Sequence, residues 1–242
     1  MEEDALRQMR AIEDRHWWYR GRRAILSNVL RELNLPMQAR ILEAGCGTGG
    51  NLRMLAGFGQ VSAVEPHPYC LECARSIGIA DIRPGRLPDA IPFERGSFDL
   101  VAALDVLEHV VNDLGSLIAL REMLKPGGWI VFTVPAFMFL WGEHDERNHH
   151  YRRYRKPSAV RLAEAAGFGE IHCQYFNTLL FPPIVAFRLM KKHLRLRQAD
   201  DDALPPSVLN QIFLRIFRVE KEVMRLLDFP FGISLVASAR KL

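Results

Sequence analysis

The sequence predicts an α/β fold with a seven-stranded, mostly parallel sheet and helices on both faces. Short apolar runs alternate with helical patterns through the first two thirds of the chain, as in strands joined by crossover helices. The run 98–104 is almost entirely apolar, which is typical of a central strand buried on both faces. The run 40–44 ends in a glycine-rich turn that opens a helix, so the turn can offer backbone N–H groups to a ligand.

The first segment of the chain is helical. Helical patterns cover 2–14 and 22–33, and the aromatic cluster His16-Trp17-Trp18-Tyr19 separates them. Pro36 closes this leader. We therefore expect an N-terminal helical lid over 1–36, followed by the unit that holds the sheet, over 37–242.

Turn residues and breakers delimit the later elements. Arg95-Gly96 precedes the central strand, Lys125-Pro126-Gly127-Gly128 ends a helix with a basic last turn, and Gly167 ends another. The expected strands are 40–44, 61–65, 79–82, 98–104, 129–134, 169–176 and 233–239. The expected helices between them are 49–57, 66–77, 112–124 and 157–166, and a long polar loop covers 141–156.

The segment at about 180–230 is interpreted as a helical insertion before the last strand. It holds two helical patterns, and its first half has an apolar face that runs into a basic stretch, Lys191 to Arg197. A basic amphipathic helix can lie on an anionic membrane, and packing against the sheet or a second subunit is the other interpretation. Peripheral membrane contact therefore stays open.

Composition limits the classes of function. A net charge of +4 is too small to indicate nucleic acid as a partner, and the sequence holds no aromatic and basic platform for it. No apolar segment reaches the roughly 18 residues that span a bilayer, and the charged start has no apolar signal segment, so we expect a cytoplasmic protein. Cys70 and Cys73 form a single C-x-x-C without a second pair, so no zinc or redox site is expected there.

The glycine-rich turn points to a nucleotide or nucleoside. Gly45, Gly47 and Gly50 satisfy G-x-G-x-x-G, and Glu65 lies about twenty residues later, as in dinucleotide-binding proteins. Glu43, however, stands two residues before the first glycine, where dinucleotide sites prefer small apolar residues, and Gly49 gives the tighter run G-C-G-T-G. The later chain also has no Tyr-x-x-x-Lys pair. An NAD-dependent oxidoreductase is therefore the alternative interpretation.

Several further segments stand in a specific order and spacing, namely 41–49, Val64-Glu65, 87–93, 97–101, 104–110 and 124–128. Together they resemble the class I S-adenosylmethionine-dependent methyltransferases, in the type 11 branch that includes quinone-biosynthesis enzymes. The resemblance covers about 40–176. It implies a Rossmann-like fold with an antiparallel last strand, S-adenosylmethionine as cofactor, and transfer of a methyl group to a small-molecule acceptor.

The resemblance also implies roles for residues of the cofactor half. Glu43, Gly45, Cys46, Gly47 and Gly49 would form and organise the turn around the methionine and ribose parts. Glu65 would accept both ribose hydroxyls, because a carboxylate has two acceptor oxygens. The backbone N–H of Leu87 would face the adenine in place of the family's acid or serine. Asp105, which follows the central strand, would lie beside the methyl group or serve as a helix N-cap.

Catalysis needs a general base only when the acceptor atom carries a proton. His109 is the best candidate by position, together with Asp105, and the other interpretation makes His109 a structural histidine. Arg86 stands in the expected adenine loop, where the family has other residues. This departure keeps a third hypothesis open, a protein that binds the cofactor without turnover.

The acceptor is expected to contact the loop 141–156, the leader and the insertion. Long polar loops at this edge of a sheet often bind ligands. His144, Tyr154 and the pair Arg152-Arg153 are the candidates in the loop, with Arg152 reading an anionic group, and Tyr19 is the candidate in the leader. His144, Asp145 and His149 match no standard metal spacing, so no metal site is expected. A lipid-linked or anionic acceptor would suit these residues.

Overall fold

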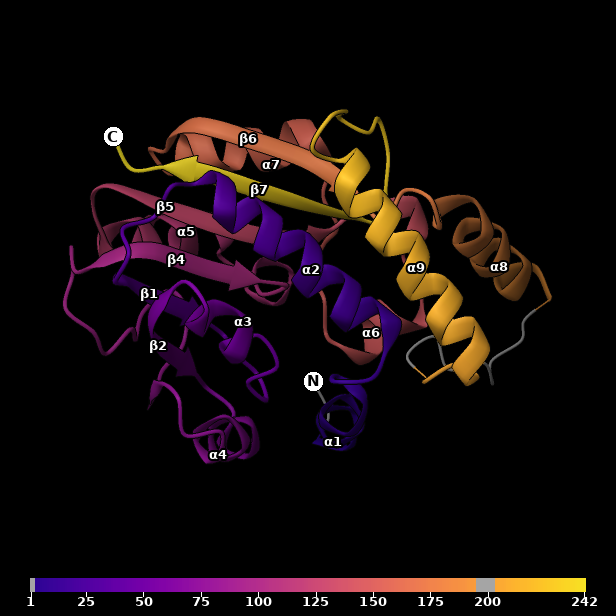
Figure 1. Cartoon of the computed structure of the whole chain (residues 1–242), viewed down its shortest axis with the longest axis horizontal. Helices are drawn as coiled ribbons and strands as arrows, with labels where there is room; N and C mark the ends of the chain where they lie inside the picture. Colours follow the sequence, from indigo (N-terminus) through magenta and orange to yellow (C-terminus); the bar gives the residue numbers. More distant parts are fainter. Residues whose placement is uncertain (1–2, 195–202) are drawn as a thin grey trace.

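The computed structural model describes residues 3–194 and 203–242. A seven-stranded sheet forms its centre, in the order β3-β2-β1-β4-β5-β7-β6 (Figure 1). The strands are β1 (Ala39–Ala44), β2 (Gly59–Glu65), β3 (Asp81–Pro84), β4 (Phe98–Leu104), β5 (Leu124–Pro135), β6 (Gly169–Phe176) and β7 (Ser234–Arg240). The first five strands pair in parallel, and β7 is antiparallel to both β5 and β6. The predicted fold class is confirmed, including the antiparallel last strand.

Helices cover both faces of this sheet (Figure 1). One buried cluster joins it to α5 and α7, and a second joins it to α2, α3, α4 and α9. The helices are α1 (Glu3–Ile12), α2 (Trp17–Glu32), α3 (Leu52–Ala56), α4 (Pro68–Ser76), α5 (Asp113–Met123), α6 (Glu143–Arg147), α7 (Lys156–Ala165), α8 (Phe181–Leu194) and α9 (Ser207–Val223). Short 3₁₀ turns occupy Leu107–His109 and Met138–Leu140. The alternation of strand and helix therefore builds the three layers that the sequence predicts.

The leader differs from the prediction in where its second helix begins. The aromatic cluster does not separate the helices: α2 begins at Trp17, because Nδ1 of His16 accepts the backbone N–H of Trp18 at 3.1 Å and caps the helix. The ring of Trp17 packs edge-on against Phe213 and Phe217 of α9. The leader is thus docked on the insertion as well as on the sheet.

Strand β5 begins earlier than the predicted residue 129. Leu124 already pairs with Phe98 of β4, and after a register shift the pairing resumes at Trp129 opposite Leu100. Gly127 in the shifted segment has a φ of +76°, a conformation that glycine adopts without strain. The breaker run Lys125-Pro126-Gly127-Gly128 therefore lies within the strand rather than in a separate turn.

The insertion is helical, as predicted. Its helix α9 packs along α2 on one face of the sheet (Figure 1), and α8 follows β6. The last part of the predicted basic stretch, 195–197, lies outside the described residues. Among the helices that the structure describes, none is long and apolar enough to cross a membrane.

Candidate functional site

A cavity of about 690 Å³ lies at the edge of the sheet where the parallel strands end. Ligands bind at this edge in open α/β sheets, because the loops after the strands meet there. The turns after β1, β2 and β4 form one side of the cavity, and α1 with the start of α2 forms another. The 3₁₀ turn 107–109, the segment around α6 and the helix α8 complete it.

The turn after β1 is fixed to the end of β2. The backbone N–H of Gly45 donates to the carbonyl of Val64 at 2.8 Å. The carboxylate of Glu65 accepts the backbone N–H of Gly47 at 2.8 Å and that of His67 at 2.9 Å, one on each oxygen. Each carboxylate oxygen keeps a further lone pair, and Glu65 lines the cavity. Burial raises the pKa of Glu65, and the two backbone hydrogen bonds oppose that rise.

The glycines of this turn face different surroundings. Gly45 and Gly47 have φ angles of +70° and +55°, and both line the cavity. A Cβ on Gly47 would meet only the end of the Met9 side chain, at 3.6 Å, so it would occupy the cavity. Gly49 faces the other way, because a Cβ there would strike Ile77 and Leu52. The turn therefore presents backbone to the cavity at Gly47 and packs on helices at Gly49.

A buried polar chain runs behind the turn. Oε1 of Glu43 accepts a hydrogen bond from Nδ2 of Asn51 at 2.9 Å, and Oδ1 of Asn51 accepts one from Arg22 at 3.1 Å. Arg22 forms an ion pair with Asp105, and Thr133 donates to the other Asp105 oxygen at 2.9 Å. The chain therefore links the ends of β1 and β4 to helix α2. Arg22 and Asp105 line the cavity, whereas Glu43 lies behind it.

Burial shifts the pKa values of two members of this chain, Glu43 and Arg22. Glu43 is fully buried, and this raises its pKa to about 7. Burial also lowers the pKa of Arg22 to about 10. Among the described residues, Oε2 of Glu43 has no hydrogen-bond partner. Because water is excluded from its carboxyl group, Glu43 gains or loses its proton near neutral pH.

The loop after β3 bounds the same end of the cavity. Leu87 lines it together with Gly85 and Arg86. The backbone of Arg86 is paired with Ala90 in both directions, at 2.8 and 2.9 Å, so this loop is a closed turn. Cys46 lines the cavity too, and burial raises the pKa of its thiol, which makes it an apolar wall at neutral pH.

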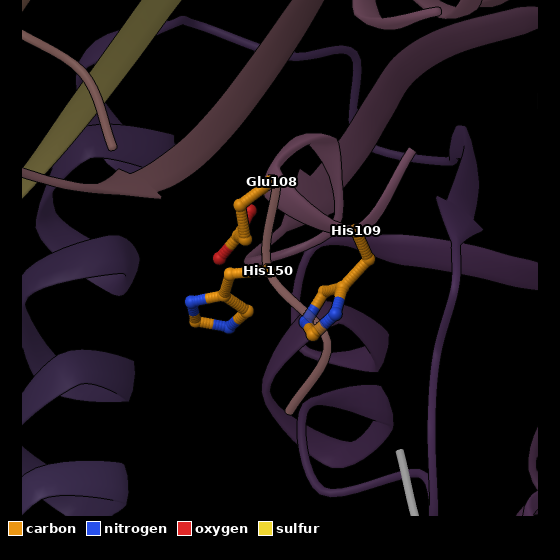
Figure 2. A group of neighbouring side chains, drawn as sticks. All are labelled: Glu108, His109 and His150. Atoms are coloured by element: carbon orange, nitrogen blue, oxygen red, sulfur yellow. The ribbon is translucent and has the colours of Figure 1, made fainter. Parts of the chain in front are cut away.

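The other end of the cavity gathers Glu108, His109 and His150. Figure 2 shows their side chains directed toward one another, although His150 comes from the loop after α6. The two imidazole rings lie edge to face with centroids 4.6 Å apart. Burial raises the pKa of Glu108 to about 8 and lowers that of His109 to about 3, with His150 adding to the latter shift.

These three residues are also where the described part of the chain could hold a metal ion. One oxygen or nitrogen of each lies within 4.8 Å of those of the other two. The sequence did not suggest Glu108 and His150 as metal ligands, because they are far apart along the chain. The sequence-based expectation of no metal site stays a prediction.

Asp145 organises the loop that carries His150. Its carboxylate accepts a bidentate pair of hydrogen bonds from Arg153, at 2.8 and 2.9 Å, and one from Nδ1 of His150 at 2.8 Å. The backbone N–H of Gly142 donates to it as well. Burial alone would raise the pKa of Asp145, but the bonds from His150 and Arg153 outweigh it and hold that pKa well below its usual value. Asp145 is therefore an anion that fixes the loop.

The structure separates the acceptor-side candidates into two groups. Tyr19 and His144 line the cavity. Arg152 and Tyr154 lie outside its lining and both bind Asp113, the former as an ion pair at 2.7 Å and the latter through its hydroxyl at 2.8 Å. Of the arginine pair it is Arg153 that reaches the cavity, because neighbouring residues of an extended segment face opposite sides.

Sequence reasoning missed Arg22's ion pair with Asp105, the clamp of Arg153 on Asp145, and the place of Glu108 and His150 in the cavity. Glu108 and His109 share the motif that ends β4, so a signal for Glu108 existed. The residues from α2 and from the loop 141–156 come from segments whose placement depends on tertiary packing.

Comparisons with known proteins agree with this geometry. A family model described as a methyltransferase domain matches residues 17–175. A ubiquinone biosynthesis O-methyltransferase of Xanthomonas campestris pv. campestris (strain B100) is 31% identical over 176 residues, which cover 65% of this chain and 72% of that protein.

Solved structures share the fold. A geranyl diphosphate C-methyltransferase from Streptomyces coelicolor A3(2), in complex with Mg²⁺, geranyl diphosphate and S-adenosyl-L-homocysteine, has a TM-score of 0.61 at 14% identity, covering 90% of this chain and 78% of that one. A phosphoethanolamine N-methyltransferase 2 from Haemonchus contortus, in complex with S-adenosyl-L-methionine, has a TM-score of 0.58 at 19% identity, covering 88% and 51%. Both alignments extend beyond the sheet to most of this chain.

Proposed function

The chain belongs to the methyltransferase-domain family and is an S-adenosylmethionine-dependent methyltransferase, and on this premise we propose that it methylates a hydroxyl group of a small-molecule acceptor. One observation carries the proposal. A single cavity joins the glycine turn and Glu65 at one end to Glu108, His109 and His150 at the other. The nicotinamide-dependent alternative has no support in the comparisons.

The cofactor end of the cavity fits S-adenosylmethionine. Glu65 offers the acceptors that a ribose needs, and the side of Gly47 that a Cβ would fill is open to the cavity. The proposed cofactor residues are those of the sequence prediction, Glu43, Gly45, Cys46, Gly47, Gly49, Glu65, Leu87 and Asp105, with Glu43 and Gly49 acting from behind the turn. When bound, the cofactor supplies a methyl group on a positively charged sulfur.

Arg22 is the proposed partner of the cofactor's carboxylate. It is a buried cation in the cavity wall, oriented by Asn51 and Asp105. Because both oxygens of Asp105 are already engaged, by Thr133 and by Arg22, we assign Asp105 the role of holding Arg22 rather than of taking a proton. In this proposal Arg22 binds the carboxylate of the cofactor at one end, and the Glu65 carboxylate binds its ribose at the other.

His109 is the proposed catalytic residue on the acceptor side. It lines the cavity beside Glu108 and His150, so one ring nitrogen of its imidazole can accept the hydroxyl proton of a bound acceptor. Alignment of the acceptor and exclusion of water would supply much of the remaining acceleration. Tyr19 and His144 are proposed to contact the acceptor from the cavity wall.

The character of the acceptor follows from the wall around this end. Ile184 and Phe187 of α8 supply apolar surface, and Arg147 and Arg188 supply positive charge. An aromatic hydroxyl compound with an anionic group or an apolar chain would match both, and the relative named as a ubiquinone biosynthesis O-methyltransferase supports that class. We also propose that 1–36 forms a lid and 37–242 the methyltransferase unit. A cytoplasmic location and peripheral contact with a membrane are further parts of the proposed function.

A transfer assay with two catechols tests this proposal. The protein is incubated with methyl-labelled S-adenosylmethionine and either 3,4-dihydroxybenzoate or a catechol that carries a short isoprenoid chain, and methylated product is measured by mass spectrometry. We expect methylation of at least one catechol, and a loss of kcat of about a hundredfold or more in His109→Gln. His172→Gln is the matched control, because His172 is exposed on β6 away from the cavity. Cofactor binding without transfer to either catechol would contradict the acceptor class.

A further inference from the structure

Helix α1 forms the outer wall of the cofactor end of the cavity. Leu6, Met9 and Glu13 line that end, and Met9 approaches the open side of Gly47. Among the ten described residues of α1, Leu6 is the buried one, whereas α2 buries five. A helix with so little buried surface is held by few contacts, so each polar contact that fixes it counts.

Two contacts join this region to the core: the Arg7 guanidinium of α1 lies over the ring of Tyr69, 4.6 Å from its centroid, and Glu13, which follows α1, binds the cofactor turn. Oε2 of Glu13 accepts the hydroxyl of Thr48 at 2.9 Å, and Oε1 accepts Nη1 of Arg10 at 2.8 Å. The Glu13 residue is only 3% exposed. A hydrogen bond to a buried charge is worth more than one at the surface, because water cannot replace it.

The turn has a space shaped for this carboxylate. A Cβ on Gly50 would lie 2.3 Å from Oε2 of Glu13, so the missing side chain of Gly50 is what admits Glu13. The third glycine of the G-x-G-x-x-G pattern thus makes room for the Glu13 side chain rather than for a phosphate.

The chain just after α1 is anchored independently of the turn. Arg23 donates to the carbonyl of Glu13 at 2.8 Å. Asn210 of α9 accepts the backbone N–H of Trp17 at 2.8 Å and donates to the carbonyl of Arg15 at 2.9 Å. These bonds hold the junction between α1 and α2 in place, so loss of the bond between Glu13 and Thr48 would free α1 while leaving α2 docked.

We infer that Glu13 is a positioning residue that fastens α1 over the cofactor turn through Thr48, so that this bond sets how fast the cofactor and its product leave. The inference rests on the proposed cofactor site. When the bond is made, Leu6 and Met9 cover the cofactor end, and when it breaks, α1 opens about the anchored junction. Glu13 contacts the turn and not the reacting atoms, so its effect is on release rather than on methyl transfer.

The release rate of S-adenosylhomocysteine tests the inference. Wild type and variants are loaded with this product, mixed with excess S-adenosylmethionine in a stopped-flow instrument, and followed by the fluorescence of Trp17 and Trp18, which line the cavity. Glu13→Leu, which has no acceptor, and Thr48→Val should each speed release by roughly tenfold, the factor that corresponds to about 1.4 kcal/mol. The double variant should match the single variants, since all remove the same bond.

Two controls separate this role from a general loss of structure. Thr48→Ser keeps the hydroxyl and should release the product at the wild-type rate. Glu3→Gln removes an exposed ion pair with Arg7 on the same helix and should also behave as wild type. Hydrogen exchange of the α1 amides in the product complex should be faster in Thr48→Val, with the amides of β1 and β4 unchanged.

The outcomes distinguish the role of Glu13 from the proposed function on which it rests. Unchanged release in Glu13→Leu and Thr48→Val, or additive effects in the double variant, would overturn the role of Glu13 while leaving the cofactor site in place. A wild-type protein that does not bind S-adenosylhomocysteine would overturn the proposed function and this inference with it.

Discussion

The carboxylate of Glu65 accepts a hydrogen bond from the backbone N–H of Gly47, with 2.8 Å between oxygen and nitrogen. The bond joins the end of β2 to the turn after β1. The last residues that pair between these two strands are Ala44 of β1 and Val64 of β2. Glu65 therefore both shapes the glycine turn and faces the cavity that the turn borders.

Glu65→Gln should weaken binding of S-adenosylhomocysteine by about tenfold to a hundredfold, because a neutral amide offers one acceptor where the carboxylate offers two, and hydrogen bonds to charged groups contribute about 1.5–3 kcal/mol. Isothermal titration calorimetry measures the change. Glu72→Gln, at an exposed position of α4, is the control and should bind as wild type. Equal affinity in all three proteins would remove Glu65 from the site.

Gly47→Ala and Gly78→Ala form a matched pair. Gly47 and Gly78 have φ angles of +55° and +73°, so alanine at either position should cost about 1–2 kcal/mol of folding stability. A Cβ on Gly78 would meet nothing within 4 Å, whereas one on Gly47 would enter the cavity. Urea unfolding should therefore show similar losses, and calorimetry should show weaker S-adenosylhomocysteine binding in Gly47→Ala alone. Weaker binding in both variants would point to backbone strain instead.

Arg153→Ala should destabilise the fold far more than Arg152→Ala. The side chains of Arg153 and Asp145 are 2% and 0% exposed, and removal of one partner leaves a buried charge, at a cost of about 3–5 kcal/mol. The ion pair of Arg152 with Asp113 is more exposed, and such pairs contribute about 1 kcal/mol or less. Urea unfolding of the two variants gives the comparison, and equal losses would contradict it.

Stability should fall as the pH rises toward neutrality, because of Glu43. Burial raises its pKa from 4.5 to about 7, so between these values the folded protein binds more protons than the unfolded chain. The free energy of unfolding then decreases with rising pH, by a total on the order of 3 kcal/mol from this residue. Glu43→Gln should make the dependence less steep in urea unfolding series from about pH 5 to pH 8, with part of it remaining because burial also raises the pKa of Glu108, to about 8. Glu72→Gln should leave the dependence unchanged. Parallel curves for wild type and Glu43→Gln would refute the effect.

The regular elements of the fold could be predicted where local pattern and tertiary environment agree. Strands 98–104 and 169–176 match β4 and β6 residue for residue, since a central strand and a strand preceded by Gly167 have clear boundaries in sequence. The prediction was wrong at the aromatic cluster, where His16 caps α2, and at residues 124–128, where pairing with Phe98 extends β5 through breakers. The first depends on a local cap that the aromatic pattern hides, and the second on a pairing of Leu124 with Phe98, which is distant in sequence.

The residues proposed for the cofactor could be grouped from the sequence more readily than those proposed for the acceptor. Gly47 and Glu65 belong to consecutive strand ends, and parallel strands bring such ends together. The local sequence does not indicate which of Arg152 and Arg153 faces the cavity. It also does not indicate that His150 contacts His109. Those relations depend on how the loop 141–156 folds around Asp145.

The most direct test of the account is calorimetric titration of the purified protein with S-adenosylhomocysteine and, separately, with NADH. We expect micromolar binding of S-adenosylhomocysteine and no binding of NADH, because in the proposed site the turn and Glu65 bind one nucleoside and the rest of the cavity takes the acceptor. Binding of NADH in place of S-adenosylhomocysteine would contradict the assignment of the cavity.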